Sequence, residues 1–281
     1  ASLTSYRDAI DSLATPVRGN ITPDTITLLR GDSTSLYEYL DRHVDIQSSI
    51  RYKKERTGLI GVSSGTDEDA VGLLAQTLGN TRMRIVYPDL AVLSLEDAQG
   101  TVREYLVDGC MIASAMSGNR ASPNIDVATP WTNGRLVGFT QLGRTLDAVE
   151  QNQVAVQGVT VMEDQPPFLK VRHGLTTDMS TILTKLPTII QIADEVQRQT
   201  RSVLDQFIGI KFLPIVKGQI DGRVAAMFKS LIKAQIVAAY TGISTTIDPN
   251  DPTTAEVQGY YAPIFPLLYL ICSYHLRGQL S

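Results

Sequence analysis

The sequence lacks most of the residue patterns on which metal, redox and nucleic-acid chemistry depend. Of its 281 residues, 2 are cysteine and 3 are histidine, and His43, His173 and His275 lie too far apart in the chain for a zinc site. Lys and Arg number 25 against 29 Asp and Glu, so the net charge of −4 offers no basic excess to nucleic acid. We therefore expect no metal, no cofactor and no nucleic-acid partner.

Long apolar runs are also missing. A membrane-spanning helix needs roughly 18–20 apolar residues, and the longest candidate, Ile264 to Leu276, is interrupted by Pro266. No signal peptide is evident, and a chain that starts at Ala1 is compatible with a processed protein or a fragment. Cys110 and Cys272 both lie in apolar segments, which favours buried thiols in a reducing compartment over a disulfide. We expect no membrane insertion.

The first 87 residues alternate between helical and strand patterns. The predicted elements are a helix at 5–13, strands at 25–29, 57–62 and 82–87, and helices that begin after Ser33 and Thr66. Such alternation favours a parallel sheet with right-handed crossovers.

The rest of the chain mixes both patterns. The predicted elements are helices at 104–118, 144–154, 188–208 and 219–239, strands at 156–162 and 169–173, and one or two strands within 255–276. Together these patterns predict an α/β protein in two parts. Residues 1–165 would hold a parallel or mixed sheet flanked by helices, and residues 166–281 an α+β part with two long helices.

One segment matches a hydrolase motif. Gly61-Val-Ser-Ser-Gly65 fits G-x-S-x-G between a predicted strand and a predicted helix, with Ser63 as the nucleophile. The other triad members would come from Asp126 or Asp178 and from His173 or His275. The acidic helix start at 66–69 would oppose an oxyanion, so a plain strand-to-helix turn is favoured. A serine hydrolase or esterase remains the alternative function.

The same turn is a poor phosphate loop. It has neither the Lys-Ser/Thr pair of a Walker motif nor the third glycine of a dinucleotide fingerprint, and its acids would repel phosphate. A nucleotide-binding module is a third, weaker alternative.

Four residues are candidates for contacts with a partner. Trp131 is the single tryptophan, and it lies in the loop-like, proline-containing segment 119–135. It could stack on a ligand, although a lone tryptophan more often anchors packing or an interface. Lys229 and Lys233, with Arg223, could form a basic helix surface that faces an acidic partner.

The order of several short segments resembles the core of contractile phage tail sheath proteins. The matching pieces are Ile112–Ala115, Ala121–Asn124, Leu146–Asn152, Gln157–Glu163 and Val171–Asp178, with weaker ones at Leu40–His43, Arg82–Pro88, Phe207–Gly209 and Tyr240–Gly242. No single piece is specific, but they follow the family's order. The Gly-Ala-Arg-Thr motif of many sheaths has no clear counterpart, which indicates a divergent member.

The resemblance implies a mechanical function without catalysis. Sheath subunits form hexameric rings that stack into a helix around the tail tube, and on a signal from the baseplate the sheath contracts and drives the tube through the host envelope. It would place the protein in the virion tail, and in the host cytoplasm during assembly. If there is such a tube, we expect Lys229 and Lys233, with Arg223, to be the candidates for facing it, because a regular basic row could slide against an acidic cylinder. The terminal arms that join family members are expected to be trimmed or absent here.

Overall fold

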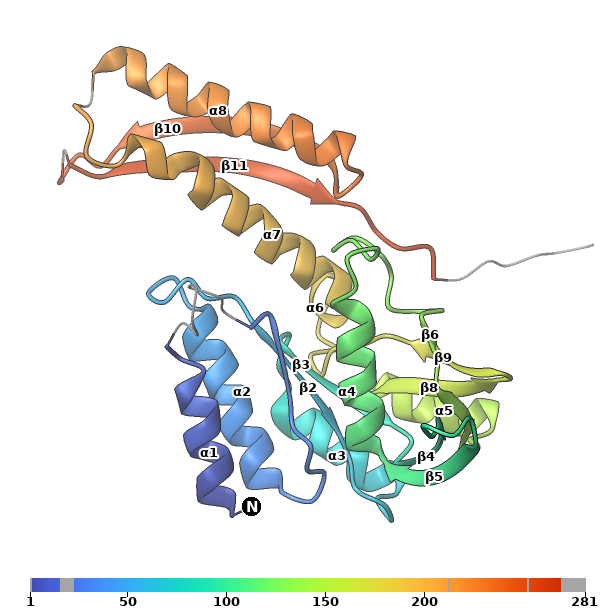
Figure 1. The fold of residues 1–281 in the computed structure, drawn as a ribbon. Helices are drawn as coiled ribbons and strands as arrows, with labels where there is room; N and C mark the ends of the chain where they lie inside the picture. The colour runs from blue at the N-terminus through green and yellow to red at the C-terminus, as the bar shows by residue number, and fades with distance from the viewer. Residues whose placement is uncertain (1, 16–22, 212, 252, 269–281) are drawn as a thin grey trace, which may run out of the picture.

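The main sheet of the protein is mixed, with helices on both faces (Figure 1). The computed structural model describes residues 2–15, 23–211, 213–251 and 253–268. The strand order is β1 (Thr25–Thr27), β2 (Thr57–Gly61), β3 (Met83–Tyr87), β8 (Thr160–Gln165), β9 (Phe168–His173) and β6 (Arg135–Leu136). The first four strands run parallel, whereas β9 and β6 pair antiparallel. The predicted α/β class and the mixed sheet are confirmed.

Alternate residues of the central strands enter two different hydrophobic cores. Ile60 and Ile85 face α1 (Leu3–Ser12), α2 (Thr34–Ser48), α3 (Glu68–Leu78) and α5 (Ala148–Val156). Their neighbours Leu59 and Val86 face α4 (Gly109–Arg120). Because successive side chains of a strand point to opposite faces, the apolar runs in β2 and β3 reflect burial on both sides.

A smaller sheet corrects one prediction from the sequence. It has the order β5-β4-β7 and is antiparallel, with bounds Val102–Asp108, Leu90–Glu96 and Phe139–Leu142. The sequence predicted a helix over 104–118, but the first five of those residues belong to β5 and the helix begins at Gly109. Cross-strand pairing with β4 outweighs the helical pattern here.

The C-terminal part is built on two long helices and a two-stranded sheet. Its elements are α6 (Ile182–Lys185), α7 (Pro187–Leu204), a 3₁₀ turn at Asp205–Phe207, α8 (Pro214–Lys233), β10 (Val237–Ile247) and β11 (Ala255–Pro263). Residues of α7, α8 and β10 form a third hydrophobic core. Figure 1 shows α8 and the β10–β11 sheet standing away from the main sheet, with α7 reaching between them.

Two boundaries in this part differ from the prediction. The helix expected over 219–239 ends at Lys233, and β10 follows at Val237 after Gln235, whose φ is 59°. A left-handed residue stops the helix, so the apolar pattern continues as a strand. The end of the segment expected as strands at 255–276 lies outside the described residues. The division of the chain at residue 165, which coincides with the end of β8, stays a prediction.

Gly61, at the end of β2, gives a test of the packing between the main sheet and α4. A Cβ at this position would lie 2.0 Å from the carbonyl oxygen of Gly109. We expect Gly61→Ala to lower the free energy of unfolding by about 1–3 kcal/mol, because the two backbones must separate. Urea titration measures this.

Gly218 in α8 is the matched control, since nothing lies within 4 Å of a Cβ added there. Gly218→Ala should raise stability by about 1 kcal/mol, because alanine favours a helix. Equal effects of the two substitutions would contradict the close approach at Gly61.

Candidate functional site

The G-x-S-x-G segment forms a turn that neighbouring segments hold in place. The backbone N–H of Ser63 donates to the carbonyl of Gly31 (2.9 Å), and the N–H of Gly65 donates to Asp89 Oδ2 (2.7 Å). Helix α3 starts only at Glu68, after its N-cap Asp67. The nucleophile of a hydrolase elbow stands at the helix start, whereas Ser63 lies several residues before it.

The predicted triad partners are not brought to Ser63. His173 in β9 is paired with Val161 in β8, and β8 is separated from β2 by β3. Three strand spacings put β9 about 14 Å from β2, beyond the reach of a hydrogen bond. His275 lies outside the described residues.

The two candidate acids serve their own turns instead. Asp126 Oδ1 accepts from the N–H of Ala128, and Asp178 Oδ1 accepts from the N–H of Ser180, both at 2.9 Å. The described part of the chain therefore assembles no Ser-His-Asp constellation.

Metal and membrane features are not found within the described ranges. No group of three or more His, Cys, Asp or Glu side chains there could hold a metal ion, and no helix there has the length and apolarity to cross a bilayer. His43 accepts a hydrogen bond from Arg56 (3.0 Å), and burial together with that guanidinium lowers the pKa of the imidazole. Cys110 is a buried free thiol, and Cys272 falls outside the described residues.

Trp131 is an internal packing residue. The residue is 3% exposed, and two guanidinium groups lie against its ring, those of Arg84 (4.7 Å) and Arg120 (4.9 Å). Its indole N–H donates to Gln191 Oε1 at 3.0 Å. Burial, and secondarily the charge of Arg120, lowers the pKa of Arg84 to about 9. The tryptophan therefore links the main sheet, α4 and α7, and its contact with a partner stays a prediction.

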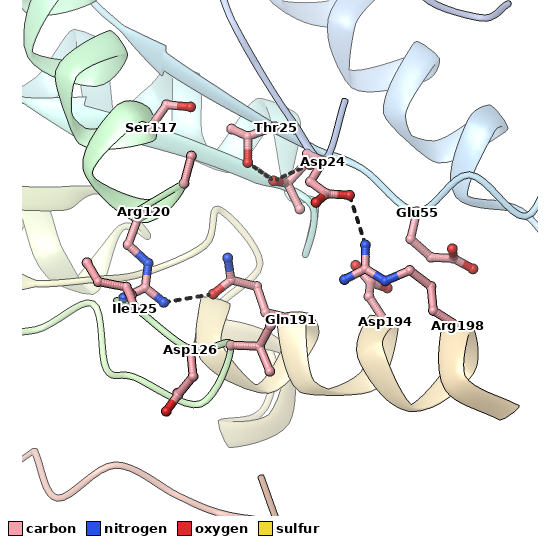
Figure 2. A pocket seen from close by; sticks show the side chains of 13 residues that line it. Asp24, Thr25, Glu55, Ser117, Arg120, Ile125, Asp126, Gln191, Asp194 and Arg198 are labelled. Carbon is pink, nitrogen blue, oxygen red and sulfur yellow. Dashed lines mark hydrogen bonds and ion pairs between the residues drawn. The ribbon is translucent and has the colours of Figure 1, made fainter. Parts of the chain in front are cut away.

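A pocket of about 290 Å³ lies where α7 crosses the end of the main sheet (Figure 2). Its α7 wall carries Asp194 and Arg198, and its opposite walls carry Asp24, Glu55 and Arg120. In Figure 2 the guanidinium of Arg198 points to Asp24, and that of Arg120 to Gln191. Among the charged residues of the lining, Arg198 and Asp24 thus pair across the pocket, whereas Asp194 and Glu55 pair with arginines outside the lining.

Three ion pairs join one face of α7 to the main sheet and the loops beside it. They are Arg82–Asp194 (2.7 Å), Arg198–Asp24 (2.8 Å) and Arg201–Glu55 (2.6 Å). Positions 194, 198 and 201 share a helix face because they are four and three residues apart. Burial opposes ionisation of Glu55, but the hydrogen bond with Arg201, a backbone hydrogen bond and the charges of Arg201 and Arg198 together outweigh it, and the pKa of the carboxyl is lowered. These three ion pairs, which we call the α7 ion pairs, hold α7 in its direction across the end of the main sheet.

The three basic candidates all lie on α8, and all are exposed. Lys229 and Lys233 share one face because they are four residues apart. Arg223 precedes Lys229 by six residues, which turns it about 120° around the helix. Neither lysine forms an ion pair with any described residue. The two lysines thus make a common basic surface, from which Arg223 is displaced.

Comparison with known proteins shows which proteins share this fold. No family model matches the chain. A tail sheath protein of Mycobacterium phage Bxz1 is 26% identical over 246 residues, which is 85% of this chain and 41% of that protein. The helical sheath of the anti-feeding prophage in its contracted state superposes over 97% of this chain and 73% of its own, with a TM-score of 0.69 and 13% identity. This chain has the tail sheath fold. The resemblance predicted from the sequence is confirmed.

The sheath fold covers nearly the whole chain. A sheath tail protein from Listeria innocua matches 94% of this chain and 60% of its own length, with a TM-score of 0.67 and 13% identity. The chain spans less than half of its mycobacteriophage relative. The matched region is therefore the part of the sheath fold that these proteins have in common with this chain.

The α7 ion pairs differ in burial, which predicts different effects on the stability of the folded chain when each pair is broken. The side chain of Asp194 is 7% exposed and that of Asp24 is 72% exposed. We expect Asp194→Ala to lower the free energy of unfolding by about 3–5 kcal/mol, because Arg82 keeps a partly buried charge without a partner. Asp24→Ala should cost less than about 1 kcal/mol, as exposed pairs do. Urea titration measures the free energy of unfolding of both variants. Equal losses in the two variants would contradict the greater importance of the buried pair.

Proposed function

We propose that the chain is the core of a structural subunit of a contractile phage tail sheath. In this function it polymerises around the tail tube and contracts to drive the tube through the host envelope. One observation carries the proposal: a chain that is 26% identical to a tail sheath protein also has the fold of a contracted helical sheath along 97% of its length. Among the described residues no contact favours the hydrolase alternative. Because the proteins that this chain resembles are named as sheath proteins, we infer that it works without catalysis.

Self-association in this proposal is supported by the β10–β11 sheet. Within the described ranges it has two strands, and most of their residues are exposed. Unpaired strand edges can accept a further strand from another chain. A strand contributed by a neighbouring copy would connect subunits through backbone hydrogen bonds while their other surfaces change. The assembly that we propose for these copies is a stack of hexameric rings that forms a helix.

The proposed location is the tail of the virion, with assembly in the host cytoplasm. The tail tube protein and the baseplate are the other partners, and neither nucleic acid nor a membrane is one. Immunogold labelling tests this with antibodies raised against the chain and virions of the phage that encodes it. Gold particles along the tail support the proposal, whereas labelling of the capsid or of no structure contradicts it.

The surface of Lys229 and Lys233, supplemented by Arg223, is the proposed contact with the tube. We expect Lys229→Glu combined with Lys233→Glu to weaken tube binding at least tenfold, because two attractions to an acidic cylinder become repulsions. Binding of the unmodified chain should also fall as salt rises. Cosedimentation with tube polymers measures both effects.

A matched control uses two basic residues in the exposed loop before β2. Arg51→Glu combined with Lys53→Glu makes the same change in net charge on another surface. This control should bind tubes as the unmodified chain does. Equal loss in both variants would mean that net charge matters and that the α8 surface does not.

A further inference from the structure

The turn between α7 and α8 exposes an apolar surface with positive charge. We define the helical tip as Ile208, Ile210, Lys211, Leu213, Ile215 and Lys217. The side chains of Ile208 and Ile215 are 78% and 67% exposed, and Ile210 and Leu213 are also exposed. Neither lysine has an ion-pair partner among the described residues, and Asp205 is the one carboxylate described between 205 and 217. Exposed apolar groups gathered at one place mark an interaction site.

The outer side of the β4–β5 hairpin exposes an apolar surface with negative charge. We define the hairpin face as Val92, Glu96, Val102, Glu104 and Leu106. They share one side of the sheet, since Val92 pairs with Leu106 and Glu96 with Val102. Val102 and Leu106 are 63% and 66% exposed. The opposite side, with Ala91 and Val107, packs on the core.

The helical tip and the hairpin face cannot meet within one chain. Figure 1 shows the α7–α8 turn at the far end of the C-terminal part and the β4–β5 hairpin at the opposite end of the main sheet. β5 is also the edge strand of its sheet. A contact between them therefore requires two copies. Because the two surfaces differ, the contact is heterologous, and repetition without closure generates a helix of subunits.

We propose that the helical tip of one copy docks on the hairpin face of the next copy. Aliphatic side chains of Ile208 and Ile215 pack on Val102 and Leu106, and Lys211 and Lys217 approach Glu96 and Glu104. The inference rests on the proposed function and names one contact of that assembly. Four aliphatic side chains cover roughly a few hundred Å², less than the 800 Å² per partner of a stable complex. Each contact is therefore weak and exchangeable, as a contracting assembly needs.

Charge reversal in two separate variants tests the contact. The tip variant carries Lys211→Glu and Lys217→Glu, and the hairpin variant carries Glu96→Lys and Glu104→Lys. In each one, tip and hairpin face have charges of the same sign, so we expect self-association to weaken at least tenfold. In an equimolar mixture, the negative tip of the tip variant can dock on the positive hairpin face of the hairpin variant, and the positive tip of the latter on the negative hairpin face of the former. Association should therefore return. Sedimentation velocity over a range of concentrations measures all three samples.

The recovery on mixing excludes misfolding as the cause of a loss. The control for the hairpin variant carries Asp8→Lys and Glu38→Lys, two exposed positions on α1 and α2, and makes the same change in net charge. It should associate like the unmodified chain. An unmodified chain that stays monomeric at every concentration, or variants that do not recover when mixed, would overturn the inference. The two proposals can also fail separately. If the antibody labels the tails of virions, but either charge-reversed variant still forms a normal sheath, the inference is overturned and the proposed function is left intact.

Discussion

The partly buried ion pair between Arg82 and Asp194 determines how the C-terminal part is held. Arg82 immediately precedes β3, and Asp194 lies in α7, with two N–H···O bonds of 2.7 and 2.8 Å between them. The third hydrophobic core joins α7 to α8 and β10. The direction of α7 therefore sets where α8 and β10 lie relative to the main sheet. A partly buried pair contributes little net stability. Its value is geometric, because an alternative direction of α7 would leave one of the two charges unpaired.

Around this pair, polar and apolar contacts fix the same helix. Gln191 of α7 accepts hydrogen bonds from both Trp131 and Arg120, at 3.0 and 3.2 Å. Ile192 and Val196 of α7 enter the third core. Helix α7 thus connects the two parts: it forms hydrogen bonds and ion pairs with the main-sheet part and packs in the hydrophobic core of the C-terminal part. In the proposed function, such a subunit would keep its own shape while its neighbours change.

The sequence predicted the first 87 residues well because each signal there is local. The helix start after Thr66 and the apolar run of β2, which is buried on both sides, each act within one element. The β4–β5 hairpin was missed because β5 is exposed along most of its length. Its sequence therefore lacks the alternation of apolar and polar residues that marks a half-buried strand. Strand β10 was missed because its stability comes from pairing with β11, a contact that no short window of sequence contains.

The surfaces divide in the same way. Exposure of Lys229 and Lys233 follows from helical spacing alone, and the structure has both exposed on α8. The burial of Trp131 depends on Arg84 and Arg120, which come from β3 and α4 and meet only in the folded chain. The distance between Ser63 and His173 likewise depends on strand order. The family resemblance succeeded where these patterns did not, because it rests on the order of many weak segments.

The most direct test of a rigid, neighbour-exchanging subunit is cryo-electron microscopy of the tail in its extended and contracted states. We expect the chain to superpose as one body between the two states, with the Arg82–Asp194 contact kept and the angle between α7 and the main sheet unchanged. A contact that is broken in one state, with α7 swung away from the sheet, would contradict this.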